Sequence, residues 1–372
     1  MIELVVEPYG TAPNMEPADD TTVARWEQQL TEALDGWEAE GTTGAWVAIS
    51  LPATGFWCRA AGTTSAGGPA ASLGDHSRIG SVTKTITATA VLEQVAADAL
   101  SLDQTVADVL PDVADRFPPT ARVTVRQLLA MDSGLPDYAN VRGGAFTRAV
   151  DDPARIWTPE DLVGCALEAG EPAEPGTPGY STTGYAVLAL VLERLTGRPA
   201  HEVITDVARR AGLEQTVLAA PDDNTMPEPY VRGYQDRAGV VDMRGIGIDE
   251  PVGTDFTDLP VASLGGAGGG AYSTIGDLFN WAASGSGTSL LARDLAEQRT
   301  DLRVDIPGVG RYGLGLLAPF HNGLIGHTGQ SLGYEAVALH HPGTGATVAM
   351  MANSTDGLGG LLAAFEDVVG GR

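Results

Sequence analysis

Lys84 is the only lysine among 372 residues, and arginine supplies every other residue of the Lys and Arg total. An arginine guanidinium keeps its proton in proteins, whereas burial and positive neighbours can drive a lysine ammonium to its neutral form. Of the two residue types, only lysine can act as a base. Ser81 precedes Lys84 by three residues, although the chain contains only 15 serines. This spacing makes Ser81 and Lys84 the first candidates for chemistry.

A helix that begins at Ser81 would bring the two side chains together. Residues i and i+3 share one face of a helix, so the hydroxyl and the amine can touch. A helix N-terminus also favours negative charge on the serine oxygen. The pair is therefore a candidate for the activated Ser-x-x-Lys nucleophile of acyl-enzyme chemistry. The helix itself is predicted by the apolar residues Ile86, Val91, Leu92 and Val95.

The elements around this helix indicate an antiparallel sheet. Residues 45–51 and 56–59 predict a hairpin that turns at Gly55. Helices are predicted before this hairpin, over 21–37, and at the end of the sequence, over 358–369. We expect an α+β fold in which an antiparallel β-sheet is flanked by N- and C-terminal helices. Further strands are predicted at 311–317, 324–326, 334–340 and 347–353.

Between these strands the sequence is mostly helical. Residues 123–131 and 183–195 predict helices, and Gly197 ends the second. Ser273 or Thr274 caps a further helix over 277–283. Residues 219–270 are rich in Gly, Pro and Asp, so we expect long loops there that decide the substrate.

The domain organisation follows from this order of elements. The first and last parts of the chain are predicted to form one α/β domain, interrupted by a large, mostly helical insertion. The predicted units are an N-terminal arm at 1–20, an α/β domain at 21–105 and 298–372, and a helical domain at 106–297.

Composition excludes several classes of function. The formal net charge of −26 repels phosphate backbones and anionic membranes, so we expect no nucleic-acid partner. No stretch approaches the roughly 20 apolar residues of a membrane span. Residues 1–20 lack the basic and apolar regions of a signal peptide, which predicts a cytoplasmic location. Two cysteines make no disulfide framework, and no spacing predicts a metal or another cofactor.

Three short motifs occur in the order found in the class C β-lactamase and DD-peptidase superfamily, and the chain resembles that superfamily over residues 20–370. This resemblance implies a penicillin-binding-protein-like fold and extends to the esterase and transacylase members. The motifs are Ser81-Val82-Thr83-Lys84, Tyr180-Ser181-Thr182 and His327-Thr328-Gly329.

The resemblance implies roles for individual residues. Ser81 would attack the carbonyl, Lys84 would accept its proton, and Tyr180 would relay that proton to the leaving group. Tyr180 would need the nearby cation to make its phenolate accessible. The backbone N–H groups of Ser81 and Gln330 would form the oxyanion hole. Thr182, His327, Thr328 and Gly329 would line the substrate site, with His327 setting its electrostatics.

Two departures from the family pattern bear on the substrate. Thr182 stands where the family usually has Asn, and a hydroxyl cannot offer the paired donor and acceptor of an amide. Met131 and Asp132 replace a usual His-Thr pair and change the packing behind the site. Both departures concern β-lactam or D-Ala-D-Ala specificity more than acyl-enzyme formation.

Other motifs favour different chemistry less well. Tyr272-Ser273-Thr274 matches the Tyr180 motif, but there Thr or Ser with Asp277 makes a helix cap. Residues 329–333 spell the G-x-S-x-G of α/β-hydrolases, yet an alternating strand follows and no histidine comes after the later acids. Residues 308–313 spell G-x-G-x-x-G, but the segment opens no helix.

The sequence thus predicts a serine hydrolase or acyltransferase that acts on an ester or amide of a small molecule or short peptide. A β-lactamase or D-Ala-D-Ala carboxypeptidase is one alternative. A non-catalytic ligand-binding module of the same fold is the other, although a binder would not need a deprotonatable amine. The oligomeric state, the acyl donor and the acceptor do not follow from the sequence.

Overall fold

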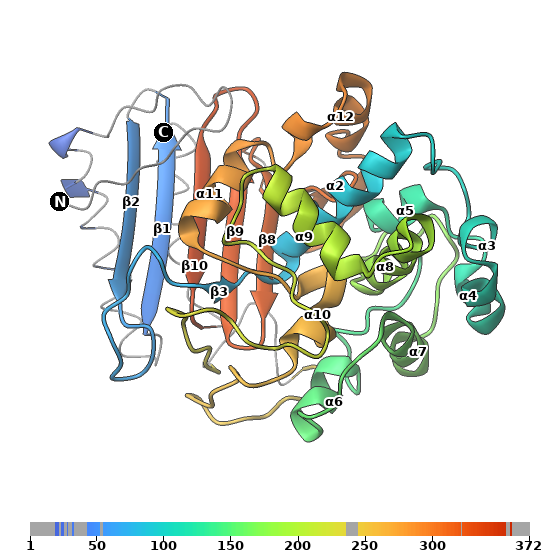
Figure 1. The fold of residues 1–372 in the computed structure, drawn as a ribbon, viewed down its shortest axis with the longest axis horizontal. Coiled ribbons are helices and arrows are strands. Elements are labelled where there is room, and N and C mark those ends of the chain that lie inside the picture. The colour runs from blue at the N-terminus through green and yellow to red at the C-terminus, as the bar shows by residue number, and fades with distance from the viewer. Residues whose placement is uncertain are drawn as a thin grey trace.

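The protein is represented by a computed structural model. It describes residues 43–52, 55–235, 245–320 and 322–354, together with residues 19–21, 24, 25, 28, 32 and 358. The predicted N-terminal arm, most of the helix at 21–37 and most of the helix at 358–369 lie outside the described residues. The arrangement of the described elements is shown in Figure 1.

Within this part of the chain, eight strands form one antiparallel sheet in the order β2-β1-β10-β9-β8-β7-β6-β5. The sheet joins distant segments of the chain, because β1 pairs with β10 and Trp46 lies opposite Met351. The strands are β1 (Gly44–Leu51), β2 (Gly55–Gly62), β5 (Val304–Ile306), β6 (Gly310–Tyr312), β7 (Leu317–Ala318), β8 (Ile325–Ser331), β9 (Tyr334–His340) and β10 (Thr347–Ala352). A separate pair is formed by β3 (Ser77–Arg78) and β4 (Tyr272–Ser273).

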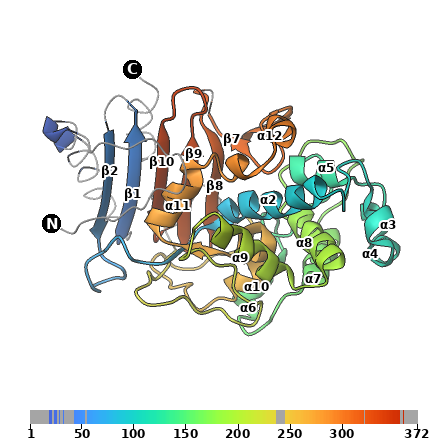
Figure 2. The ribbon, with the colours of Figure 1, turned by 45° about the horizontal axis from the view of Figure 1, so that its top comes forward.

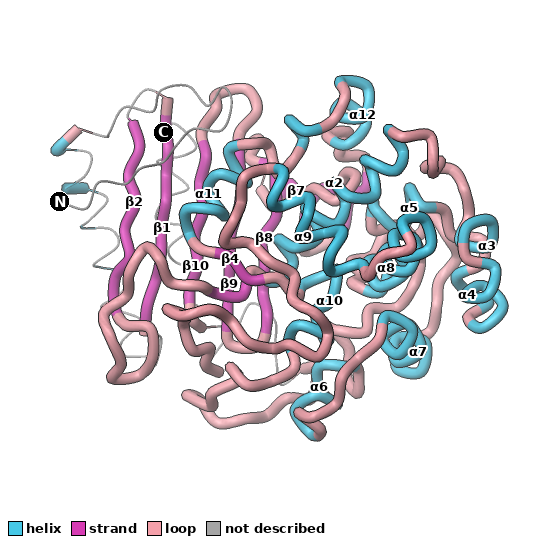
Figure 3. The backbone as a smooth tube through the Cα atoms, viewed as in Figure 1, coloured by secondary structure: helices cyan, strands magenta, loops and turns pink. Residues whose placement is uncertain are grey.

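Helices, short 3-10 turns and loops form the rest of the described chain, and Figure 3 distinguishes helix from loop by colour. The helices are α2 (Thr83–Ala96), α3 (Val106–Val109), α4 (Pro111–Arg116), α5 (Val125–Ala130), α6 (Ala145–Asp151), α7 (Pro159–Ala169), α8 (Thr183–Thr196), α9 (Ala200–Arg210), α10 (Val261–Gly269), α11 (Ile275–Ala283) and α12 (Arg293–Arg299). The 3-10 turns are η1 (Gly80–Val82), η2 (Pro118–Thr120) and η3 (Thr288–Leu290).

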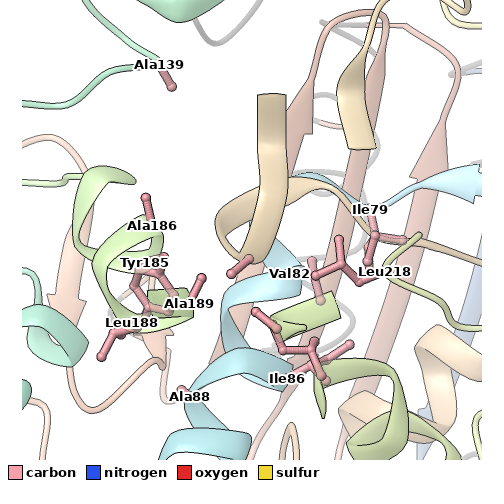
Figure 4. Packing of buried hydrophobic residues seen from close by; sticks show 14 of the residues in the cluster. Ile79, Val82, Ile86, Ala88, Ala139, Tyr185, Ala186, Leu188, Ala189 and Leu218 are labelled. Carbon is pink, nitrogen blue, oxygen red and sulfur yellow. The ribbon is translucent and has the colours of Figure 1, made fainter. Parts of the chain in front are cut away.

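Helix α2 lies beside β8, between the sheet and helix α8 (Figure 2). It contacts β8 on one side and α8, α9 and α10 on the others. Its residues from Thr83 to Leu92 are all buried, as expected of a helix surrounded by protein. Figure 4 shows Val82 and Ile86 packing at the start of this helix, with Tyr185 and Leu188 of α8 nearby. Ser81, the candidate nucleophile, therefore lies just before the N-terminus of this buried helix.

The observed elements confirm the antiparallel sheet with helices but revise several boundaries. The predicted strand at 311–317 is two short strands, β6 and β7, because the chain turns through Gly315 at a φ of +74°. Strand β8 extends to Ser331 although its glycines weaken the strand pattern. Helix α10 lies inside a region that we expected to be loops. Helix α11, assigned to the predicted helical domain, packs against β1, β9 and β10. The proposed domain boundaries stay a prediction.

Candidate active site

Ser81 lies in η1, immediately before α2, as the apolar spacing predicts to within two residues. The 3-10 turn leads directly into the helix, so Ser81 and Lys84 share one face. Lys84 Nζ lies 2.9 Å from Ser81 Oγ. The local spacing therefore places the hydroxyl and the amine on the same side of the chain.

Lys84 is fully buried and has three oxygen partners. Its Nζ lies 2.7 Å from the carbonyl oxygen of Gly268 and 3.3 Å from Thr182 Oγ1, in addition to Ser81 Oγ. A neutral amine has two N–H donors and one lone pair. When the donors point to the Gly268 carbonyl and to Thr182, the lone pair is left to accept the proton of the Ser81 hydroxyl.

The charge state of Lys84 suits a base. Burial lowers the pKa of Lys84 from 10.5 to about 7, while the negative charge of Asp137 acts in the opposite direction. A substantial fraction of Lys84 is therefore neutral near pH 7. No positive neighbour is needed to produce this shift.

Tyr180 lies in the loop before α8 and reaches the same point. Lys84 Nζ is 5.1 Å from the centre of its ring. Burial raises the pKa of Tyr180 far above its ordinary value, and its hydrogen bond with Ser81 opposes this only in part. The expectation that the nearby cation makes the phenolate accessible is therefore wrong, because burial dominates. Tyr180 is a phenol, able to pass a proton on rather than to remove one.

The Tyr180 loop is held by the segment that departs from the family pattern. The backbone N–H of Gly179 donates to the Met131 carbonyl oxygen at 2.9 Å, and that of Ser181 points at Met131 Sδ at 3.3 Å. Met131 adopts a left-handed conformation with φ of +62° at the end of α5. Thr182 is buried, and its N–H donates to Asp137 Oδ1 at 3.1 Å.

Strand β8 forms the opposite wall and packs against η1. A Cβ on Gly80, whose φ is +49°, would lie 2.6 Å from the backbone nitrogen of Gln330. A Cβ on Gly329 would lie 2.0 Å from the Ile79 carbonyl oxygen and 3.1 Å from the Ser81 nitrogen. Only glycine permits these two backbones to approach so closely. The approach brings the backbones of Ser81 and Gln330 to the same place.

His327 is buried and pairs with Tyr312, a residue that the sequence did not single out. Nε2 lies 2.8 Å from Tyr312 Oη, and Nδ1 contacts the Thr328 carbonyl oxygen. Because a carbonyl only accepts, Nδ1 carries the proton and Nε2 accepts from Tyr312. Burial and the charge of Lys84 lower the pKa of His327 to about 3. His327 is therefore neutral near pH 7 and brings no charge to the pocket.

A pocket of about 890 Å³ opens over Ser81. It is lined by every predicted site residue except Lys84, which lies buried behind Ser81: Ser81, Tyr180, Thr182, His327, Thr328, Gly329 and Gln330. Apolar side chains of the lining come from two segments, at Leu135, Pro136, Ala139 and Val141 and at Leu317, Pro319 and Phe320. In contrast to our expectation, the described residues of 219–270 contribute only Gly265, Gly268 and Gly269 to the lining.

Among all the residues that the structure describes, no cluster of three or more His, Cys, Asp or Glu is suited to a metal ion. Cys58 and Cys165 are free thiols. None of the described helices is both long enough and apolar enough to cross a membrane.

The fold is shared with hydrolases of known structure. A D-stereospecific amidohydrolase from a Streptomyces species is similar with a TM-score of 0.75 and 28% identity, over 92% of this chain and 97% of that one. D-amino acid amidase from Ochrobactrum anthropi SV3, in complex with L-phenylalanine, has a TM-score of 0.78 over 93% and 98%. Because only 23% of the residues are identical, this similarity shows a shared fold and nothing more. These neighbours define the class: a β-lactamase-like serine hydrolase fold.

The family follows from the sequence comparison. The Beta-lactamase family model matches residues 23–368, so the chain belongs to the Beta-lactamase family. Penicillin-binding protein 4 of Amycolatopsis lactamdurans is 33% identical over 199 residues, which are 53% of this chain and 46% of that protein. Matches to the curated relatives thus span less than half of their length.

Proposed function

We propose that this protein forms an acyl-enzyme at Ser81 and transfers the acyl group of an ester or amide to water or to another acceptor. The substrate would be a small molecule or a short peptide. The observation that carries the proposal is the 2.9 Å contact of Ser81 Oγ with Lys84, a fully buried amine with a pKa of about 7. The similarity to amidohydrolases is consistent with this chemistry.

In the proposed acylation, neutral Lys84 accepts the Ser81 proton as Oγ attacks the carbonyl carbon. The backbone N–H groups of Ser81 and Gln330 would stabilise the oxyanion; loss of one such donor typically costs about 10²–10³ in rate. Tyr180, a phenol beside both groups, would donate its proton to the leaving group and be reprotonated from Lys84. A second nucleophile, activated by the same groups in reverse, would release the acyl group.

Two alternatives remain open to test. The penicillin-binding protein relatives favour a β-lactamase or a D-Ala-D-Ala carboxypeptidase. A non-catalytic binding module is opposed by Lys84, since burying an amine that loses its proton lowers stability without aiding a binder.

Intact-mass measurement separates these possibilities. The protein is incubated with a fluorophosphonate, a penicillin or a p-nitrophenyl ester and then weighed. We expect one fluorophosphonate adduct on the wild type and none on Ser81→Ala. A persistent penicillin adduct or rapid penicillin turnover would favour the β-lactam alternatives. Folded protein that forms no adduct and turns over no probe would leave the binding module.

A further inference from the structure

The charged groups of the pocket are of one sign. Among its described lining residues are two carboxylates, Asp137 and Glu335, and no lysine or arginine. His327, the one histidine in that lining, is neutral because its pKa is about 3. A substrate carboxylate would thus find no cationic side chain in the described lining, whereas an ammonium would find carboxylates.

Asp137 is the carboxylate next to the reacting groups. Its Oδ1 accepts the Thr182 N–H at 3.1 Å, and Thr182 Oγ1 lies 3.3 Å from Lys84 Nζ. Oδ1 also accepts the Ala139 N–H, and Oδ2 accepts the Asn140 side-chain N–H. These three donors are neutral amides, so they fix the carboxylate in place without cancelling its charge. Asp137 is only 7% exposed, which makes this charge costly to leave unpaired.

Glu335 is placed differently. It lies on β9 opposite Gln330, and its Oε2 accepts the backbone N–H of Leu358 at 2.8 Å. Glu335 therefore ties another segment to the far wall, whereas Asp137 adjoins the Thr182 and Lys84 pair.

We propose that the preferred acyl donor carries a positively charged amine next to its carbonyl carbon and that Asp137 binds this amine. This inference rests on the proposed function. The substrate class is then the amides and esters of amino acids or of peptides with a free amino group on the acyl side. An ammonium brings three N–H donors and the opposite charge, and hydrogen bonds to charged groups contribute about 1.5–3 kcal/mol. That range corresponds to a preference of roughly 10- to 150-fold over an uncharged isostere.

The bound amine would also act on the base. The charge of Asp137 raises the pKa of Lys84, so an ammonium that neutralises it, and also repels the Lys84 ammonium, lowers that pKa. The other titratable groups around Lys84 carry no charge at neutral pH: burial raises the pKa of Tyr180 and Tyr185 and lowers that of His327. A matching substrate therefore helps to deprotonate the base that attacks it.

The test compares alanyl p-nitroanilide, as both enantiomers, with isobutyryl p-nitroanilide, in which a methyl group replaces the ammonium. Rates are measured between about pH 5.5 and 7.5, where the α-amine is mainly charged. For the wild type we expect kcat/KM at least 10-fold higher for one alanyl enantiomer. We also expect the acid limb of its kcat profile at lower pH than that of the isobutyryl substrate.

Asp137→Asn keeps the oxygen that accepts the Thr182 N–H but removes the charge, so the ratio of alanyl to isobutyryl rates should fall to about 1. Asp115→Asn, an equal charge change at an exposed position, should keep the wild-type ratio, as should Glu335→Gln. A wild-type ratio near or below 1 overturns the inference without any variant. So does a ratio that survives Asp137→Asn or disappears with Glu335→Gln. If fluorophosphonate labels Ser81 but the enzyme does not discriminate between alanyl and isobutyryl substrates, only this inference is overturned. If there is neither labelling nor turnover, the proposed function is overturned as well.

Discussion

The tripeptide Tyr-Ser-Thr occurs twice in this chain, and its two copies have different surroundings. Tyr180 lies in a pocket-lining loop, with its ring 5.1 Å from Lys84 Nζ. Tyr272 belongs to the two-residue strand β4 and pairs with Arg78 of β3. Its ring packs edge-on against His76, with centroids 5.8 Å apart. The same residues thus line the candidate active site in one place and contribute to local packing in the other.

The two threonines explain how this difference arises. Thr274 has extended dihedrals, and its hydroxyl accepts the Asp277 N–H at 3.4 Å as the N-cap of α11. Thr182 has helical dihedrals and caps nothing with its side chain, so its hydroxyl is available to Lys84. Whether a hydroxyl caps a helix decides whether it can serve a site.

The largest effect is expected from a change at Lys84, whose amine lies beside Tyr180 of the first Tyr-Ser-Thr copy. Lys84→Arg keeps a positive charge but cannot be deprotonated, so kcat/KM for a p-nitrophenyl ester should fall by about 10²–10⁴. The rate of fluorophosphonate labelling should fall in parallel. Ordinary turnover by this variant would reject Lys84 as the base.

Exchange of each tyrosine for phenylalanine compares the copies directly. Tyr180→Phe removes the proposed proton donor, and we expect a loss of about 10² or more in kcat for an amide substrate. Tyr272→Phe is the matched control and should change kcat less than twofold. The loss of kcat in Tyr180→Phe should be smaller for a p-nitrophenyl ester, because its leaving group needs no proton. Equal effects at both positions would remove the distinction between the copies.

The pH profile sharpens the assignment of the base. Lys84 must be neutral to accept a proton, and burial sets its pKa at about 7. For an uncharged ester, kcat/KM should therefore be low in acid and rise through about pH 7 with the release of one proton. A flat profile between pH 5 and 9, with chemistry rate-limiting, would contradict the assignment.

The smallest effects separate stability from activity at the two threonines. Thr274→Ala should cost about 1 kcal/mol of unfolding free energy, because an N-cap is lost, and leave kcat unchanged. Thr182→Ala removes one partner of Lys84, and we expect a severalfold lower kcat with little change in denaturant midpoint. Urea unfolding and initial rates on the same samples provide both readouts. The reverse pattern would exchange the roles of the two copies.

The sequence predicted best what depends on local spacing. Ser81 and Lys84 meet because they lie three positions apart on one helical face, and Thr274 caps α11 within its own turn. Tyr180 and His327 were found through their family resemblance, since no local pattern brings them to Ser81. Asp137 and Tyr312 were missed because their roles arise only from tertiary contacts. Strands of two or three residues, such as β5 and β7, contain too few residues to show an alternating pattern.

The pairing of β1 with β10 sets a timetable for synthesis. The Gly44 N–H donates to Asn353 Oδ1 across 309 positions of the chain, beside the pairing of β1 with β10. At a synthesis rate of about 5–20 residues per second, β10 is completed on the order of 15–60 s after β1. During that interval one edge of the nascent hairpin can pair with a neighbouring chain. Until β10 has been synthesised, this edge of β1 lacks the strand that covers it in the described sheet.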